Sequence, residues 1–338
     1  MSKGMSPLTW SISAPTLQTA TEWTLITDWL LIDTGSANTW LGEDFFIRRY
    51  GSGNVTGKVW NDTVSFSPSL IVSQQAIGVA NSSNGFDGLD GILGVGPTDL
   101  TNRTVPGVDR IPTVMDNFFS QGTISEESLG IYFIPAPETT KKGEPTFGGY
   151  DDSVIVGPVT YVPLTKTPRS SLYWGITQTI SYGSDIILPL ASGLVDTGTT
   201  LIYIASGASY IDAARPILTT DSPPADAYEQ YKNKTGATYD PATQLLKITA
   251  EQYDCLKPLV FNIEDAAYEL TANAQIWPRS LNSLINGTSD GIYLVVSDLG
   301  PFNFTGVNFI TGYTFLVYDT THGAVGFAKT QYTYADVN

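Results

Sequence analysis

The sequence predicts a mostly β protein made of two similar halves, and three observations support this prediction. The 338 residues combine 32 glycines, 20 prolines and 18 tyrosines with only 15% charged residues, a composition typical of short strands joined by tight turns. An Asp-Thr-Gly pattern with apolar flanks occurs twice, and several further segments alternate apolar and polar residues as strands do. A chain of this length with 42% hydrophobic residues can bury a large core.

The internal repeat defines the two halves. Segment 30–41 reads LLIDTGSANTWL and segment 193–204 reads GLVDTGTTLIYI, so the two aspartates lie 163 residues apart. This separation is far too long for a solenoid and fits a duplicated domain. Each apolar run predicts a buried strand, and the glycine after it predicts a sharp turn. We therefore predict an N-terminal lobe over 1–160, which carries Asp33, and a C-terminal lobe over 161–338, which carries Asp196.

Other segments complete the expected plan of each half. DGILGVGP at 90–97 predicts a buried strand that enters a glycine turn, and FITGYTFLVYD at 309–319 holds a comparable late position in the second half. GPVTYVPL at 157–164 alternates as a strand leaving the first lobe would. Short helices are predicted at 111–122, at 226–233 and at 248–259, the last with Thr249 and Gln252 in capping-box spacing.

Charge and residue counts exclude several classes of function. With 33 acidic and 17 basic residues the net charge is -16, which repels nucleic acid and anionic lipid, and no apolar run approaches the length of a membrane span. The acidic balance favours an acidic working medium, because protonated carboxylates relieve self-repulsion. Cys255 is the only cysteine, so no intrachain disulfide can form. His322 is the only histidine, which excludes multi-histidine metal sites.

The sequence contains features both for and against export from the cell. The first fifteen residues contain no apolar stretch of the kind a signal peptide needs, so we expect no export signal there. Seven Asn-x-Ser/Thr sequons suit a secreted glycoprotein, although they also arise readily in a chain rich in serine and threonine. These sequons begin at Asn54, Asn61, Asn81, Asn102, Asn233, Asn286 and Asn303.

The repeated motif suggests acid–base chemistry on a shared site. Two carboxylates held side by side cannot both ionise readily, so one keeps a proton while the other is charged. The charged member can take a proton from a water that attacks a peptide carbonyl, and the protonated member can donate to the developing oxyanion. This chemistry needs no metal and no cofactor. The expected support comes from hydroxyl-to-backbone bonds of Thr34 and Thr197, from the backbone of Gly35 and Gly198, and from the hydroxyls of Ser36 and Thr199.

These residues resemble a known family. Asp33-Thr34-Gly35-Ser36 and Asp196-Thr197-Gly198-Thr199, with DGILG at 90–94 between them, are similar to the pepsin family of aspartic proteases, and more narrowly to its secreted fungal members without disulfides. GFDGLDGILGVGP at 85–97 and ELTANAQIWPR at 269–279 extend the likeness beyond the repeat. The resemblance implies a bilobal fold of two orthogonally packed β-lobes with a central substrate cleft. It also implies an aspartic endopeptidase that acts on polypeptides as a monomer, without a cofactor, outside the cell or in an acidic compartment.

The resemblance also assigns roles to individual residues. Asp33 and Asp196 match the catalytic pair, and Trp40 matches the residue that holds the tyrosine of a flap over the substrate. Leu31, Leu89 and Ile92 match apolar positions that line the pocket for the residue before the cleaved bond, which implies a preference for large hydrophobic side chains. Core packing explains these three equally simply, and it is the alternative reading for Trp40. The flap itself matches Tyr50, Gly51, Ser52 and Gly53, which alone would read as a hairpin turn.

Three departures from the family pattern support an alternative. No upstream strand is recognisable in 1–28, the connection from Asp33 to Tyr50 is short, and a strand expected between Leu316 and Tyr318 is absent. A pepsin-like protein with such gaps would fold or cleave poorly, either as a peptide-binding protein or as the product of an incomplete gene prediction. A glycosidase with paired carboxylates is a third reading, but it requires wider carboxylate spacing and sugar-stacking aromatic residues.

Overall fold

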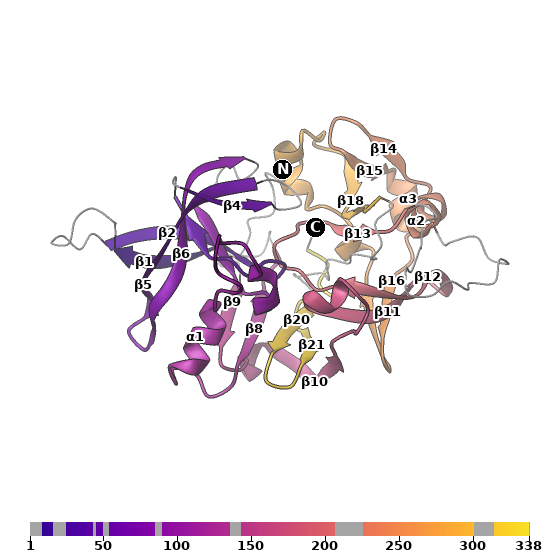
Figure 1. The fold of residues 1–338 in the computed structure, drawn as a ribbon. Coiled ribbons are helices and arrows are strands. Elements are labelled where there is room, and N and C mark those ends of the chain that lie inside the picture. Colours follow the sequence, from indigo (N-terminus) through magenta and orange to yellow (C-terminus); the bar gives the residue numbers. More distant parts are fainter. Residues whose placement is uncertain are drawn as a thin grey trace.

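The computed structural model describes residues 9–15, 25–42, 45–49, 54–84, 90–135, 143–206, 226–300 and 314–337. Strands dominate these residues, which confirms the predicted mostly β class. In Figure 1 the strands of the first half lie at the left and those of the second half at the right, with the yellow hairpin of β20 and β21 between them.

A seven-stranded sheet forms most of the first half, in the order β1-β2-β7-β3-β6-β5-β4. Its second strand, β2, pairs antiparallel with β1 and parallel with β7, so that Asp33 lies opposite Gly94. Gly91 of β7 has no room for a side chain, because a β-carbon there would collide with the backbone of Trp40. The strands are β1 (Thr9–Pro15), β2 (Leu25–Asp33), β3 (Trp40–Leu41), β4 (Phe45–Arg49), β5 (Asn54–Ser67), β6 (Leu70–Asn84) and β7 (Gly91–Gly94).

This sheet corrects two of the expected gaps. The prediction that 1–28 contains no recognisable strand is wrong, because β1 lies there and pairs with β2 from Thr9 opposite Leu31 to Pro15 opposite Leu25. The short connection after Asp33 also holds two strands, β3 and β4, both paired within the sheet.

A second sheet joins the two halves of the chain. Its order is β10-β21-β20-β8-β9, so strands from the middle of the sequence lie beside strands from its end. No separate strand lies between Leu316 and Tyr318, as the sequence predicted: β20 runs through this point as one strand and pairs with β8 on one side and β21 on the other. The strands are β8 (Ser128–Phe133), β9 (Gly143–Phe147), β10 (Ile155–Pro163), β20 (Thr314–Asp319) and β21 (Ala324–Thr330).

Three smaller sheets make up the rest of the second half that the structure describes. The largest has the order β12-β11-β16-β17, and the others are β13-β19 and β14-β15-β18. β13 begins shortly after the second Asp-Thr-Gly motif and pairs parallel with β19. The strands are β11 (Gly175–Tyr182), β12 (Asp185–Leu194), β13 (Ile202–Ile204), β14 (Thr238–Asp240), β15 (Leu245–Ile248), β16 (Leu259–Ile263), β17 (Ala266–Leu270), β18 (Ile292–Leu294) and β19 (Val296–Asp298).

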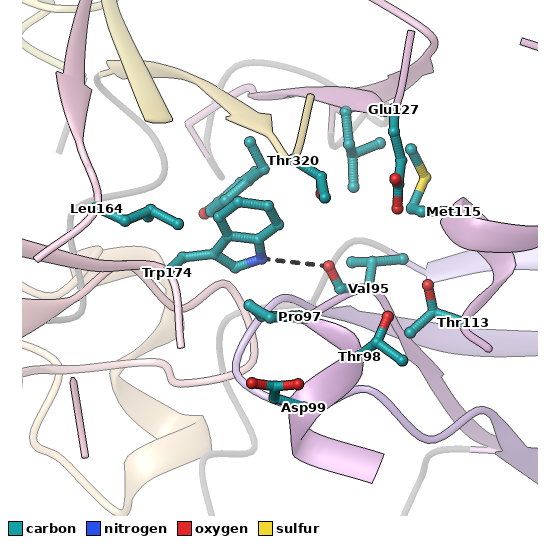
Figure 2. Close-up of a pocket in the computed structure, with 13 residues that line it drawn as sticks. Val95, Pro97, Thr98, Asp99, Thr113, Met115, Glu127, Leu164, Trp174 and Thr320 are labelled. Carbon is teal, nitrogen blue, oxygen red and sulfur yellow. Dashed lines mark hydrogen bonds between the residues drawn. The ribbon is translucent and has the colours of Figure 1, made fainter. Parts of the chain in front are cut away.

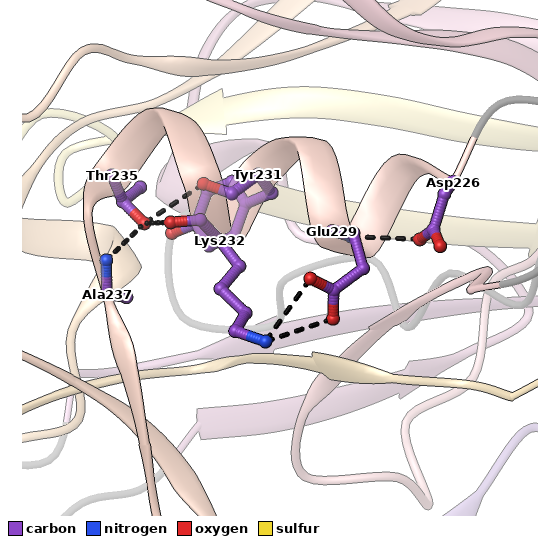
Figure 3. A network of polar contacts seen from close by, with 6 residues as sticks. All are labelled: Asp226, Glu229, Tyr231, Lys232, Thr235 and Ala237. Atoms are coloured by element: carbon purple, nitrogen blue, oxygen red, sulfur yellow. Dashed lines mark hydrogen bonds and ion pairs between the residues drawn. The ribbon is translucent and has the colours of Figure 1, made fainter.

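The predicted short helices are confirmed as α1 (Val114–Ser120), α2 (Ala227–Thr235) and α3 (Ala250–Asp254). Side chains cap their first turns, where backbone N–H groups lack helical partners. Thr249 and Gln252 form the expected capping box at α3. In α2, Asp226 accepts a hydrogen bond from the backbone of Glu229 at 2.9 Å, and Lys232 pairs with Glu229 one turn later (Figure 3).

One large apolar core runs through the described parts of both halves and includes Leu30, Phe118, Tyr231 and Phe327. Phe66, Phe118 and Phe147 pack their rings within 5.4 Å of one another, which joins β5, α1 and β9. Among the described residues no helix is long and apolar enough to cross a membrane.

Candidate active site

The two Asp-Thr-Gly loops meet at the junction of the two halves. Asp33 is the last residue of β2, and Asp196 follows the end of β12 by two residues. The first strand and turn were predicted in this form, whereas in the second copy the strand stops earlier. Both loops are therefore held at the ends of buried strands, a placement that limits how far the carboxylates can move.

The threonines of the two motifs tie the loops together through reciprocal bonds. The Thr34 N–H donates to Thr197 Oγ1 at 3.2 Å, and the Thr197 N–H donates to Thr34 Oγ1 at 2.9 Å. Each hydroxyl also donates to a carbonyl in the opposite loop, Thr34 to Val195 at 3.2 Å and Thr197 to Ile32 at 2.7 Å. Both threonine side chains are buried, so these bonds are shielded from water.

Each carboxylate is also fixed by donors of its own loop. The Gly35 N–H donates to Asp33 Oδ1 at 2.8 Å, and the Ser36 hydroxyl donates to Asp33 Oδ2 at 2.5 Å. Charge-assisted bonds of this kind are among the strongest that a side chain makes. They leave little freedom for the Asp33 side chain.

The second loop repeats this arrangement. The Gly198 N–H donates to Asp196 Oδ1 at 2.7 Å, and the Thr199 hydroxyl donates to Asp196 Oδ2 at 2.6 Å. Asp196 is half-buried, whereas Asp33 is only 6% exposed. Solvent therefore reaches the pair mainly at Asp196.

The motif glycines serve a purpose that the sequence did not predict. The predicted turn forms at Gly35 and the chain bends at Gly198, but neither glycine has the positive φ that would itself require this residue type. Instead, a β-carbon on Gly35 would lie 2.5 Å from Cγ of Asp196, and one on Gly198 would collide with Oδ1 of Asp33. The absence of a side chain on each glycine thus leaves the space that the carboxylate of the opposite loop occupies.

The pKa of Asp33 reflects this crowding. Burial raises the pKa above its usual range, and the nearby charge of Asp196 and a hydrogen bond between the two carboxyl groups raise it further. The bonds from Ser36 and Gly35 favour the charged form and act in the opposite direction. Two carboxyl groups this close cannot both ionise readily, so their titration belongs to the pair.

Three of the other predicted residues lie in a small apolar cluster beside Asp33. Leu31, Trp40 and Ile92 are buried together with Val55 and Ala80. Leu31 and Ile92 lie opposite each other in the parallel pair of β2 and β7, and Trp40 of β3 is the antiparallel partner of Ile92. Leu89 lies outside the described residues.

The predicted flap, Tyr50, Gly51, Ser52 and Gly53, also lies outside the described residues. The strands on its two sides, β4 and β5, pair antiparallel, with Arg49 opposite Asn54.

Sequence reasoning missed two aromatic residues next to the loops. Trp174 donates its Nε1–H to the carbonyl of Val95 at 3.3 Å, and the Tyr318 hydroxyl accepts a bond from Thr34 at 3.3 Å. Both line a cavity of about 250 Å³ together with Leu129, Leu164 and Thr320 (Figure 2). Tyr318 lies 284 residues from Thr34, so no local pattern could have signalled this contact.

Nothing in the described part of the chain resembles a metal site, since no three His, Cys, Asp or Glu side chains group there in a suitable way. What the paired carboxyl groups offer is a proton donor and a proton acceptor within reach of one small molecule.

Comparison with known proteins agrees with this geometry. The family described as eukaryotic aspartyl protease matches residues 41–330. Polyporopepsin from Irpex lacteus is 46% identical over 332 residues, which cover 91% of this chain and 92% of that protein. Rhizopuspepsin-1 from Rhizopus niveus is 30% identical over 247 residues, which cover 72% of this chain and 56% of that protein.

The fold agrees as well. The crystal structure of aspartic proteinase from Irpex lacteus superposes with a TM-score of 0.85 at 41% identity, covering 98% of this chain and 96% of that one. The chain therefore belongs to the eukaryotic aspartyl protease family, has the pepsin-like fold and is an aspartic endopeptidase.

Proposed function

We propose that Asp33 and Asp196 are the catalytic pair and hydrolyse peptide bonds through a water held between them. The observation that carries this proposal is the close approach of the two carboxyl groups at the motif glycines, where a β-carbon on Gly198 would contact Oδ1 of both Asp33 and Asp196. Each carboxyl group is also fixed by the donors of its own loop. One structural use of a buried acid pair would be to hold the loops together, but the threonine bonds already do so.

In the proposed reaction the charged carboxylate takes a proton from the water as the water oxygen attacks the peptide carbonyl. The protonated carboxyl group donates to the carbonyl oxygen as negative charge develops there. Collapse of the tetrahedral intermediate breaks the C–N bond, and the proton taken from the water passes to the leaving amine. The shared proton of the pair is restored at the end of the cycle.

We infer an acidic working pH from the composition. The pair itself requires only that one proton be bound, and burial together with mutual repulsion keeps that proton bound in acid and beyond, because both raise the pKa of Asp33. The net charge of -16 at pH 7 would also fall in acid, which reduces repulsion within the folded chain.

For the substrate, we infer an extended polypeptide that lies in a cleft between an N-terminal lobe, 1–160, and a C-terminal lobe, 161–338. Leu31 and Ile92 lie opposite each other, two residues before the pair of Asp33 and Gly94, and they support a preference for large hydrophobic side chains before the cleaved bond. Leu89 and the segment 50–53 are assigned to the same pocket and to a flap by their sequence alone.

The remaining inferences concern where and how the enzyme acts. We infer a monomer that works outside the cell or in an acidic compartment, as its acidic composition and its sequons support. Neither nucleic acid nor membrane is expected as a partner of so acidic a chain.

The test is cleavage of a peptide library from pH 3 to pH 7, with and without a statine inhibitor, which mimics the tetrahedral intermediate. Asp33→Asn and Asp196→Asn should each lower kcat by at least about 10³-fold, because the pair acts as one unit. Asp62→Asn on β5 is the control and should retain activity. A folded wild-type chain without inhibitor-sensitive cleavage would instead indicate a peptide-binding protein, and full activity of Asp196→Asn would remove it from the catalytic pair.

A further inference from the structure

Tyr318 reaches the threonine bonds from the core of the molecule. It is a β20 residue with 1% of its surface exposed, and its hydroxyl accepts a hydrogen bond from Thr34 Oγ1 at 3.3 Å. The single proton of this Thr34 hydroxyl is shared with the carbonyl of Val195, 3.2 Å away, and its oxygen accepts from the Thr197 N–H. Tyr318 therefore contacts the point where the two aspartate loops are joined.

Trp174 connects this tyrosine with both loops. Its ring lies 5.3 Å from that of Tyr318 at an angle of 59°, and its carbonyl accepts a bond from the N–H of Val195, the residue before Asp196. Its indole N–H donates to the carbonyl of Val95 (Figure 2), and the Val95 N–H donates to the Asp33 carbonyl at 2.9 Å. Trp174 is thus bonded directly to the backbone beside Asp196 and, through Val95, to the backbone of Asp33.

Both rings are buried in the large apolar core, and both also border the cavity of about 250 Å³. A ring has fewer packing contacts on the side that faces a cavity. The hydrogen bonds of Tyr318 and Trp174 add directional restraint to this packing.

We propose that Tyr318 is a positioning residue for peptide hydrolysis, and that its hydroxyl, with Trp174 behind it, orients Thr34 and so sets the spacing of the Asp33 and Asp196 loops. The residue does not touch the substrate and acts only through Thr34. Burial raises the pKa of the Tyr318 hydroxyl, which therefore stays neutral over the working range. This inference rests on the proposed role of the aspartate pair.

The variant Tyr318→Phe keeps the ring and removes only the hydroxyl. We expect kcat to fall about five-fold, the effect of one lost neutral hydrogen bond, while KM stays within about two-fold. We also expect the pH profile of kcat/KM to move to higher pH, since an apolar ring disfavours the charged form of the nearby pair. Trp174→Phe removes the bond to Val95 and should change kcat and the pH profile in the same direction. This variant replaces Tyr318→Phe as the test if Tyr318→Phe does not fold.

Tyr231→Phe is the matched control. Tyr231 is equally buried and donates one hydrogen bond, to Gln275 Oε1 at 3.0 Å, but it belongs to α2. The Tyr231→Phe variant should lose about as much thermal stability as Tyr318→Phe, without a change in kcat or in the pH profile. An unchanged kcat and pH profile in active, folded Tyr318→Phe, or equal changes in Tyr231→Phe, would overturn this inference alone. A wild-type chain without statine-sensitive cleavage would contradict both this inference and the proposed catalytic pair.

Discussion

Gly35 leaves the space that the carboxylate of Asp196 occupies, because a β-carbon at Gly35 would lie 2.5 Å from both Cγ and Oδ1 of that residue. Real β-carbons do not approach other atoms so closely, so any side chain at this position must displace the carboxylate or the loop. Gly198 stands in the same relation to Asp33. The close approach of the two aspartates thus depends on the absence of two side chains.

We therefore expect Gly35→Ala to lower kcat by about 100-fold or more, since a displacement of about 1 Å at reacting groups can cost that much. The measurement is kcat on a peptide substrate together with the thermal midpoint. Gly107→Ala is the control, because its β-carbon would meet no atom within 4 Å while its φ of +79° disfavours any side chain. It should cost about 1 kcal/mol of stability without loss of activity. Retention of most activity in Gly35→Ala would contradict the steric account.

Asp33→Asn should alter how stability depends on pH. The folded pKa of Asp33 is raised above its ordinary value of 3.8, so the folded chain binds more protons than the unfolded chain as pH rises above about 4. Stability that is fully present below that pH is therefore lost toward neutral pH. Asparagine cannot ionise, so the variant should have a higher melting temperature than the wild type at pH 7 and no such advantage at pH 3.

Asp151→Asn gives the control of opposite sign for this prediction. Hydrogen bonds from Ser153 lower the pKa of Asp151, so its contribution is present above the unfolded pKa and is lost in acid. Its variant should be less stable than the wild type at pH 7 and equal to it at pH 3. Parallel behaviour of the two variants across this range would contradict the assignment for Asp33.

Ser36→Ala should move the activity profile along the pH axis. The Ser36 hydroxyl favours the charged form of Asp33, so its removal raises the pKa of the pair further. A hydrogen bond to a charged group is worth about 1.5 kcal/mol, which corresponds to a shift of about one unit in the limbs of the kcat/KM profile toward higher pH.

Ser36→Thr tests whether the hydroxyl is responsible for this shift. Thr199 already serves the equivalent purpose for Asp196, so a threonine hydroxyl fits a loop of this kind. Ser36→Thr should keep the wild-type profile. An equal shift in both variants would indicate that the loop backbone, and not the hydroxyl, sets the titration.

The local parts of the site could be predicted from the sequence. The apolar run before Asp33 allows little except a buried strand, and Thr34 and Ser36 carry hydroxyls that must find acceptors once buried. The capping box of Thr249 and Gln252 likewise depends only on residues three apart. In each case the physical cause lies within a few residues of the motif.

The parts that depend on distant contacts could not be predicted. The glycine at position 35 reads as a turn former until the opposite loop is in place, and Tyr318 reads as a strand residue until Thr34 lies beside it. The segment 9–15 carries a weak strand signal and becomes β1 through its pairing with β2. The continuity of β20 also depends on its neighbours, since β8 and β21 supply its hydrogen bonds on both sides.

Glu127 should be a second source of pH-dependent stability, separate from the aspartate pair. Burial, the charge of Asp116 and a hydrogen bond to it raise the pKa of Glu127 to about 7 from an ordinary value of 4.5. Asp116 also accepts bonds from the Thr98 hydroxyl at 2.5 Å and from the Thr113 N–H at 2.6 Å, so a protonated Glu127 completes its set of donors. The contact joins the start of α1 to the chain just before β8, and Glu127 lines the same cavity as Thr98 (Figure 2).

The raised pKa means that stability from this contact is present below about pH 4.5 and is lost as pH rises through about 7. Glu127→Gln keeps a donor toward Asp116 and cannot ionise, so its melting temperature should exceed that of the wild type at pH 7.5 and match it at pH 4. Because Glu127 is only partly buried, solvent screening should keep the gain to a few degrees. Glu126→Gln removes the same charge at the exposed neighbouring position and should leave the pH dependence of the melting temperature unchanged. A gain of equal size at pH 4 and pH 7.5, or one shared by Glu126→Gln, would show that the carboxyl contact is not its cause.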